Sequence, residues 1–143
     1  MNKLNFILLQ KNDSDIPVLK KLHKHPSVKK FLSISKNYFK YVTETENVFY
    51  YKILLNNKLI GGIHCEINNT KMYLSVFISP DYRNCGYGKA SVKYILDNFT
   101  DKIEIIEVAI DEENYSSLRL FESLGFKFSE KDGKLNTYLF DVK

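Results

Sequence analysis

The chain of 143 residues has no tryptophan, only three prolines and two cysteines, and no long apolar run. A membrane-spanning helix needs about 20 consecutive apolar residues, and no segment approaches that length, so we expect no membrane partner. The apolar stretch at residues 6–9 is shorter than the core of a secretory signal peptide, about 7–15 residues, and no small-residue cleavage site follows it. These absences predict a cytoplasmic protein.

Cysteine and histidine are too few and too widely spaced to indicate a metal site or a disulfide framework. Cys65 and Cys85 do not form a C-x-x-C pair, and without a secretion signal two cysteines are expected to be free thiols. His23, His25 and His64 lack metal-ligand spacing with the cysteines. We therefore predict a protein without a bound metal.

Positive charge is present but is not concentrated. The formal net charge is +4, and the lysines are scattered along the chain. A clustered basic stripe would indicate nucleic-acid binding, so we expect no nucleic-acid partner, although the charge mildly favours an anionic ligand. The sequence also has no repeat, no low-complexity tract and no linker rich in Gly, Ser or Pro. A chain of this length is expected to form one domain over residues 1–143.

The hydrophobic pattern predicts strands interrupted by helices. Apolar runs predict strands at residues 4–9, 48–55, 58–67, 72–78, 103–110, 126–128 and 137–140. Apolar residues at helical spacing predict helices at residues 16–25, 27–42, 86–99 and 114–124. Ser27 is expected to cap the second helix and Asn114 the last one, and Gly125 is expected to end that last helix in a left-handed conformation.

The order of these elements predicts an α+β fold. We expect a mixed, mostly antiparallel central sheet with a βαβ crossover around residues 72–110 and helices on both faces. The strand at residues 103–110 is almost continuously apolar, so we expect it to be buried on both of its faces.

The most informative segment is residues 77–90, which read Phe-Ile-Ser-Pro-Asp-Tyr-Arg-Asn-Cys-Gly-Tyr-Gly-Lys-Ala. This order predicts a strand, a proline turn, a loop with two glycines, and the start of a helix. Such a loop offers free backbone N–H groups beside the positive end of the helix, an arrangement that binds phosphate or pyrophosphate. The segment therefore predicts a phosphorylated ligand.

Two familiar phosphate-binding motifs fit this loop poorly. A P-loop has the pattern G-x-x-x-x-G-K-[ST], but Arg83 stands at its first glycine and Ala90 at its hydroxyl position. The dinucleotide fingerprint G-x-G-x-x-G has Ser91 at its third glycine and should directly follow a strand. The dinucleotide motif stays open as an alternative, because Glu104 or Glu107 lies about 20 residues further on.

A third motif fits better. The pattern Arg83-x-x-Gly86-x-Gly88 resembles the coenzyme A pyrophosphate loop of the GCN5-related N-acetyltransferases, or GNAT family. Downstream, residues 114–126 resemble the second signature of that family: an asparagine, a helix with an aromatic residue, and a closing Gly-Phe. The two motifs occur in the family's order, and the likeness covers essentially the whole chain. The resemblance implies the GNAT fold and acetyl-CoA as a cofactor.

The resemblance also implies where the cofactor binds. In the family, the pantetheine arm lies between two splayed parallel strands, here those ending at Ile78 and Ile110, and pairs with main-chain groups. Asn114 matches a family residue that contacts the pantetheine, although an asparagine there can equally cap a helix. The implied cofactor-binding residues are Val76, Phe77, Ile78, Arg83, Asn84, Cys85, Gly86, Tyr87, Gly88, Lys89, Ala90 and Asn114.

The catalytic residues are less well defined. Many family members place a tyrosine on the helix after the asparagine to protonate the thiolate that leaves, but the matching residue here is Phe121. The candidate replacements are Tyr115, Tyr73 and Tyr138. Glu107 is the first candidate for the general base, because partial burial on an apolar strand would raise its pKa, and Glu66 is the second. A water relay to a backbone carbonyl is a further alternative.

The implied function is transfer of an acetyl group from acetyl-CoA to a primary amine of a small molecule or peptide. The alternative is a coenzyme A-binding sensor or partner module with weak or absent catalysis, which Phe121 suggests. The region expected to hold the acceptor has no acidic cluster that would mark a polyamine site, since Glu44 and Glu46 are only two charges. Both a monomer and a homodimer fit the sequence.

Overall fold

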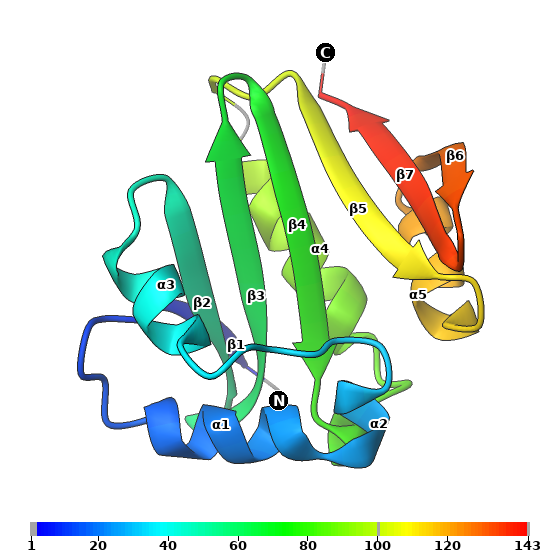
Figure 1. Ribbon diagram of the computed structural model, residues 1–143. Coiled ribbons are helices and arrows are strands. Elements are labelled where there is room, and N and C mark those ends of the chain that lie inside the picture. Colours follow the sequence, from blue (N-terminus) through cyan, green and yellow to red (C-terminus); the bar gives the residue numbers. More distant parts are fainter. Residues whose placement is uncertain (1–2, 100, 143) are drawn as a thin grey trace.

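A seven-stranded sheet runs through the computed structural model, which describes residues 3–99 and 101–142 (Figure 1). The strand order is β1-β2-β3-β4-β5-β7-β6. The strands are β1 (Leu4–Leu8), β2 (Val48–Leu55), β3 (Lys58–Asn68), β4 (Lys71–Ile78), β5 (Ile105–Asp111), β6 (Lys127–Asp132) and β7 (Leu135–Asp141). The helices are α1 (Ile16–Lys24), α2 (Pro26–Lys29), α3 (Tyr38–Glu44), α4 (Tyr87–Asn98) and α5 (Tyr115–Ser123), with a 3₁₀ turn, η1 (Pro80–Tyr82).

Strands β1 to β4 form an antiparallel sheet in which asparagine supplies the tight turns. Asn56 and Asn57 connect β2 to β3 with φ angles of 49° and 70°, and Asn69 connects β3 to β4 with φ 58°. Asparagine enters this left-handed region more readily than most residues with a side chain.

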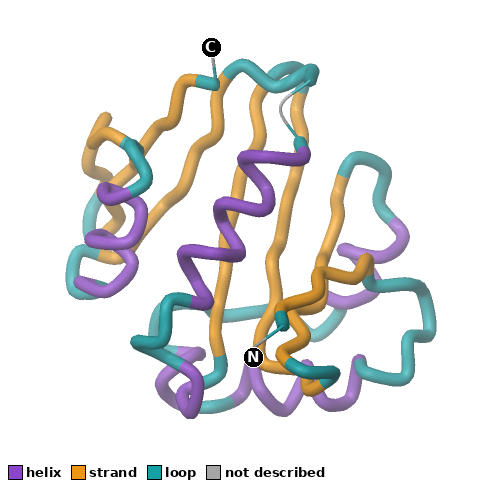
Figure 2. Tube along the Cα trace, turned by 180° about the vertical axis from the view of Figure 1, so that it is seen from behind, coloured by secondary structure: helices purple, strands orange, loops and turns teal. Residues whose placement is uncertain are grey.

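The chain then crosses over. Strands β4 and β5 are parallel, and η1 and α4 connect them, with α4 lying across the back of the sheet (Figure 2). Strands β5, β7 and β6 pair antiparallel. The mixed, mostly antiparallel sheet and its βαβ crossover are therefore confirmed, as are helices on both faces (Figure 1).

The prediction of one helix over residues 27–42 is wrong. The structure has the short α2, a loop over residues 30–37, and the separate helix α3. The capping residue is also His25 rather than Ser27: Nδ1 of His25 accepts the N–H of Ser27 at 3.2 Å. Pro26 explains the difference, because its fixed φ suits the first helical position and leaves the preceding residue as the cap.

Two hydrophobic clusters cover the two faces of the sheet. The larger cluster packs α4 and α5 against the sheet and includes Ile63, Met72, Ile95 and Ile106. The smaller cluster packs α1 and α3 against the opposite face through Leu19, Phe39, Tyr50 and Phe77. Side chains alternate between faces along each strand, so β3 and β4 contribute to both clusters.

The expectation that β5 is buried on both of its faces is wrong. Ile106, Val108 and Ile110 are buried against the helices, but Glu107 is only partly buried and Ala109 is exposed. No helix among the described residues covers the front of β5 (Figure 1). The apolar sequence of β5 therefore does not mean that both faces of the strand are covered, and its front face is open to ligands.

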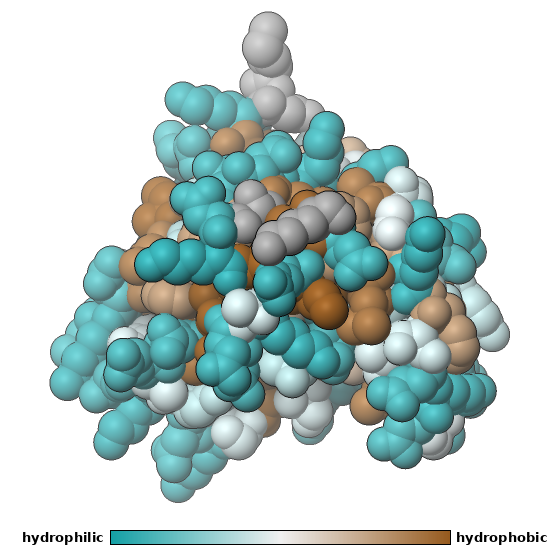
Figure 3. All heavy atoms as spheres, turned by 90° about the horizontal axis from the view of Figure 1, so that it is seen from above, coloured by the Kyte–Doolittle hydropathy of each residue, from teal (hydrophilic) through white to brown (hydrophobic). Residues whose placement is uncertain are grey.

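Polar residues surround the end of the molecule above the sheet, with hydrophobic residues in view between them (Figure 3). Within the described part of the chain, no helix is long and apolar enough to cross a membrane.

The close approach of β3 to β4 gives a stability prediction. A Cβ added at Gly61 would collide with the backbone carbonyl oxygen of Phe77 on β4. We expect Gly61→Ala to lower the free energy of unfolding by about 3 kcal/mol, because backbone atoms cannot move aside as a side chain can. Chemical denaturation measures this change.

Gly133→Ala is the matched control. Nothing lies within 4 Å of a Cβ at this turn residue, whose φ is +60°. We expect only the cost of the left-handed conformation, about 1 kcal/mol. Equal losses for the two variants would contradict the packing explanation at Gly61.

Candidate active site

Strands β4 and β5 lie side by side only at one end. Beyond Tyr73 and Glu107 their pairing stops, although both strands continue, and Figure 1 shows them diverging toward the lower end of the sheet. The facing edges of the two strands are not paired to each other in this region, so their backbone groups need other partners. The paired positions are Lys71 with Ile105, Met72 with Ile106, and Tyr73 with Glu107.

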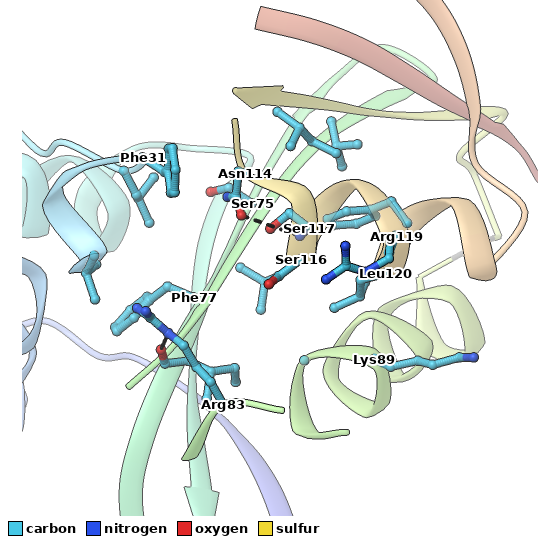
Figure 4. Close-up of a pocket in the computed structure, with 18 of the residues that line it drawn as sticks. Phe31, Ser75, Phe77, Arg83, Lys89, Asn114, Ser116, Ser117, Arg119 and Leu120 are labelled. Atoms are coloured by element: carbon cyan, nitrogen blue, oxygen red, sulfur yellow. Dashed lines mark hydrogen bonds between the residues drawn. The ribbon is translucent and has the colours of Figure 1, made fainter. Parts of the chain in front are cut away.

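A cavity of about 530 Å³ occupies the gap between these strands. Its walls come from residues 74–78 of β4, residues 108–111 of β5, the loop before α4, and the inner side of α5. In Figure 4, Phe31 lies opposite Asn114, and Phe77 and Arg83 form the lower side. The volume lies in the usual range for small-molecule sites, about 300–1,000 Å³.

The loop before α4 is shaped by two residues and braced by a third. Gly86 has φ +86° and is the N-cap of α4, while Asn84 has φ +61°. A Cβ on Gly86 would have open space around it, so the left-handed backbone is what favours glycine there. Nε of Arg83 donates to the carbonyl oxygen of Ile78 at 3.0 Å, which fixes the loop to the end of β4.

Gly88 has a different role from Gly86. A Cβ at Gly88 would lie 2.9 Å from Cδ1 of Leu120 on α5, so this glycine lets α4 and α5 approach closely. The start of α4 also leaves N–H groups without helical partners, whereas the N–H of Ala90 already donates to the carbonyl of Gly86 at 3.1 Å. The first turn of α4 has no acidic side chain, so its positive end can attract an anion.

Most residues of the predicted cofactor site line this cavity. Cys85 and Ala90 are the exceptions, and the side chain of Lys89 extends away from the other labelled residues in Figure 4. Sγ of Cys85 donates instead to the carbonyl of Arg83 at 3.3 Å. The lining residues from the predicted set are Val76, Phe77, Ile78, Arg83, Asn84, Gly86, Tyr87, Gly88, Lys89 and Asn114.

Asn114 begins α5 and faces the cavity. Its Oδ1 accepts the N–H of Ser117 at 3.4 Å, so the predicted helix cap is confirmed (Figure 4). The amide nitrogen of the same side chain can still donate to a ligand. One residue can therefore serve both roles that its position suggested.

A hydrogen-bonded network lies on the front face of the sheet beside the cavity. Nε2 of His64 lies 3.3 Å from Oε1 of Glu66, and Nδ1 of His64 lies 2.6 Å from the hydroxyl of Tyr38. The hydroxyl of Tyr41 donates to the same Glu66 oxygen at 2.8 Å. His64 pairs across the strands with Ser75, which lines the cavity. Glu66 itself does not line the cavity, and its link to the cavity edge is His64, the cross-strand neighbour of Ser75.

The protonation states in this network follow from burial and charge. Burial lowers the pKa of His64, although the neighbouring Glu66 opposes that shift, and burial raises the pKa of Tyr38. The hydrogen bond to Glu66 raises the pKa of Tyr41. A neutral His64 can accept from the Tyr38 hydroxyl at Nδ1 and donate to Glu66 from Nε2.

Glu107 lies elsewhere. Its carboxylate is 2.6 Å from Nζ of Lys71, and it does not line the cavity. It lies where β4 and β5 are still paired, and Glu66 lies at the same level of the sheet, because Tyr73 pairs with both residues. The two carboxylates differ in their partners: Glu107 is paired with Lys71, whereas Glu66 is hydrogen-bonded to His64 and Tyr41.

The sequence profile of the acetyltransferase (GNAT) family matches residues 16–126. The chain belongs to this family. No curated protein sequence matches it. A domain from Methanocaldococcus jannaschii has 25% sequence identity and a TM-score of 0.83, with 97% of this chain and 99% of that chain covered.

Two further solved structures share the GNAT fold. Spermidine N-acetyltransferase from Vibrio cholerae, in complex with CoA and spermine, has 16% identity and a TM-score of 0.82, with 97% and 95% of the two chains covered. The Campylobacter jejuni N-acetyltransferase PseH, in complex with acetyl coenzyme A, has 14% identity and a TM-score of 0.74, with 99% of each chain covered. At these identities the likeness supports the fold alone.

Within this GNAT chain, the position expected to carry a tyrosine is buried and apolar. Phe121 is 3% exposed, lines the cavity and packs edge-on against Phe126 at 5.0 Å between ring centroids. Tyr115, one of the candidate replacements, is 62% exposed and does not line the cavity. The tyrosines that do line it among the described residues are Tyr82 and Tyr87.

The sequence analysis missed several residues of this GNAT site. Arg119 lines the cavity from α5, and its guanidinium lies near Ser116 in Figure 4. Because Arg119 lies within the second motif, its place in the sequence could have indicated that it lines the site. His64 was considered only as a metal ligand, yet strand alternation already places it on the same face as Glu66. Phe31 was assigned to a helix rather than to a cavity wall.

The cap at Asn114 gives a second prediction. We expect Asn114→Ala to lower the free energy of unfolding by about 1 kcal/mol, because the Ser117 N–H loses its acceptor. We expect Asn114→Asp to keep the cap and to unfold like the wild type. Urea denaturation of both variants is the measurement, and an equal loss in both would show that capping is not what Asn114 contributes.

Proposed function

We propose that this protein is an acetyl-CoA-dependent N-acetyltransferase that acts on a primary amine of a small molecule or peptide. The observation that carries the proposal is the cavity between the diverging strands β4 and β5, closed at one end by the N-terminus of α4. An open strand edge and a positive helix end in one cavity suit a ligand with an amide-containing arm and a pyrophosphate. Membership of the GNAT family supports the same ligand.

The residues around the cavity divide into two binding regions. The N–H groups of the first turn of α4, with Gly86 left-handed before them, would hold the pyrophosphate. Main-chain groups of residues 76–78 and the amide of Asn114 would hold the pantetheine arm. Arg119 adds positive charge from α5. Arg83 acts mainly as a brace, since its Nε is already bonded to Ile78.

Acetyl-CoA supplies an acetyl thioester that an amine can attack. Glu66 is the favoured base, because its hydrogen-bond partner His64 is the cross-strand neighbour of Ser75 on the cavity wall, whereas Glu107 is paired with Lys71. An amine with a pKa near 10 arrives protonated and must lose a proton before its nitrogen attacks. Tyr41 and His64 hold the Glu66 carboxylate in place by hydrogen bonds.

Phe121 has no proton to donate to the departing thiolate. A thiol with a pKa near 8.5 is a tolerable leaving group, so solvent can supply this proton, at the loss of a general-acid contribution of roughly 10²–10⁴. This buried phenylalanine supports a second candidate function, a coenzyme A-binding module with weak or absent catalysis. Turnover of any amine above the spontaneous rate excludes the bare binding module.

Cofactor binding is the first test. We expect isothermal titration with acetyl-CoA to show one site per chain, and Gly86→Val to weaken the affinity at least tenfold because valine rarely adopts φ +86°. Gly133→Val is the control, since it introduces the same residue at a left-handed position of the β6–β7 turn, outside the cavity. No binding at millimolar acetyl-CoA would overturn the proposal.

The base assignment is tested by a pair of variants. We expect Glu66→Gln to lower kcat for an amine acceptor by roughly 10²–10⁴, the usual contribution of a general base. Glu107→Gln should stay within about twofold of the wild type, because Glu107 lies outside the cavity and its partly exposed ion pair with Lys71 is expected to contribute little. Release of free coenzyme A thiol is measured for both. A loss confined to Glu107→Gln would reverse the assignment.

A further inference from the structure

A second hollow lies on the opposite side of the loop that follows α2. Its volume is about 320 Å³, and α1, the end of α2 and residues 33–36 of the loop form its walls. Four of the residues that line it are lysines: Lys20, Lys24, Lys29 and Lys36. The loop therefore separates two spaces, with Phe31 and Leu32 on the cofactor cavity and residues 33–36 on this second hollow, which we call the lysine hollow.

The charge of the lysine hollow is not compensated. No acidic residue lines it among the described residues, and none of its four lysines takes part in an ion pair found in that part of the chain. The hydroxyl-bearing residues Ser33 and Ser35 add further hydrogen-bond donors. Four like charges around one space repel one another, and a bound anion would relieve that repulsion.

A buried imidazole forms part of the same wall. His23 lines the lysine hollow and is 2% exposed. Its Nε2 lies 2.9 Å from the hydroxyl of Tyr50, while its Nδ1 has no hydrogen-bond partner. Burial lowers the pKa of His23 to about 4, so the ring is neutral at pH 7, and burial raises the pKa of Tyr50, which keeps its proton.

The tautomer of His23 follows from this pairing. A phenol is a stronger acid than a neutral imidazole, so Tyr50 donates to Nε2 and the ring proton resides on Nδ1. The wall therefore contains a buried N–H donor without an acceptor, which is an unfavourable state. The four ammonium groups and the two hydroxyls can donate to an oxyanion, and His23 places an unsatisfied donor in the wall behind them.

The lysine hollow is also close to the cofactor cavity. The ring of His23 packs on Phe77, with 4.3 Å between ring centroids, and Phe77 lines that cavity. Tyr38, whose ring lies 5.8 Å from His23, hydrogen-bonds to His64 in the network of Glu66. One layer of aromatic side chains thus separates the donors of the hollow from the Glu66 network, which would remove the proton from the amine.

We propose that the lysine hollow binds an oxyanion group, phosphate or carboxylate, that belongs to the amine acceptor itself. This inference rests on the proposed acetyltransferase function and names its substrate class: amines that carry a negatively charged group. It also separates this chain from enzymes that accept polyamines, because a polycation would be repelled by the four lysines.

Matched amines test the proposal. Phosphoethanolamine is compared with ethanolamine, and glucosamine 6-phosphate with glucosamine, and spermidine serves as a polycation, all at one ionic strength. We expect at least one phosphorylated amine to have a kcat/KM at least tenfold above that of its unphosphorylated partner and above that of spermidine. An unphosphorylated amine or spermidine preferred over both phosphorylated compounds would overturn the proposal.

Variants locate the effect. Lys24→Gln combined with Lys36→Gln should lower kcat/KM for the phosphorylated amine about tenfold, since two solvated charge contacts of up to about 1 kcal/mol each are lost. The same variant should change the neutral amine less than twofold. Lys127→Gln with Lys134→Gln, two exposed lysines near β6 outside the hollow, is the control and should leave both substrates unchanged.

Binding of inorganic phosphate distinguishes the sources of the oxyanion. Phosphate is titrated into the wild type and the Lys24/Lys36 variant while the ¹⁵N signals of His23 are followed by NMR. If phosphate shifts His23 in the wild type alone but the acceptor preference is absent, the hollow binds a separate anion and the acceptor assignment is wrong. If phosphate shifts neither protein, the site itself is wrong. Acetyl-CoA titration, which needs no acceptor, shows independently whether the proposed function stands.

Discussion

The divergence of β4 and β5 is the constraint on which the rest of the site depends. A parallel pair that remained hydrogen-bonded along its length would leave no free edge and no room for a ligand. Here the pairing stops after Tyr73 and Glu107, and the cavity begins directly beyond them. Helices α4 and α5 support the separated strands from behind, and they approach each other closely where Gly88 faces Leu120.

The same divergence divides the chemistry of the site into two faces. Behind the sheet, the buried residues Val108, Ile110 and Phe121 give an apolar wall next to the positive end of α4. In front, the sheet is open at β5, and the polar side chains of His64 and Glu66 lie near Ser75. A ligand in the gap can therefore be held from behind while an acceptor reaches it from the front.

Much of the fold could be predicted because its signals are local. Asparagine at the turns, Gly125 with φ +96° after α5, and Asn114 as a helix cap each depend only on neighbouring residues. The segment at residues 27–42 could not be predicted in this way. Its apolar spacing suits one helix, but Phe31 and Leu32 line the cavity and the chain crosses the sheet as a loop, which is a tertiary effect.

The site shows the same division. The loop at residues 83–88 was found from its glycines and its place after a strand, and those are sequence properties. Glu107 was favoured as the base because it interrupts an apolar strand, but the sequence does not reveal that Lys71 lies 2.6 Å from it or that β4 and β5 are still paired there. The burial of His23 and the grouping of four scattered lysines around one hollow likewise arise only when α1 folds against the loop.

The most direct test of this account is a crystal structure of the protein grown with acetyl-CoA. The account predicts the pyrophosphate on the N–H groups at the start of α4 and the pantetheine between β4 and β5, with the thioester beyond Tyr73 and on the side of Ser75. A cofactor bound on any other surface, or a gap between the strands that stays closed to it, would contradict the account.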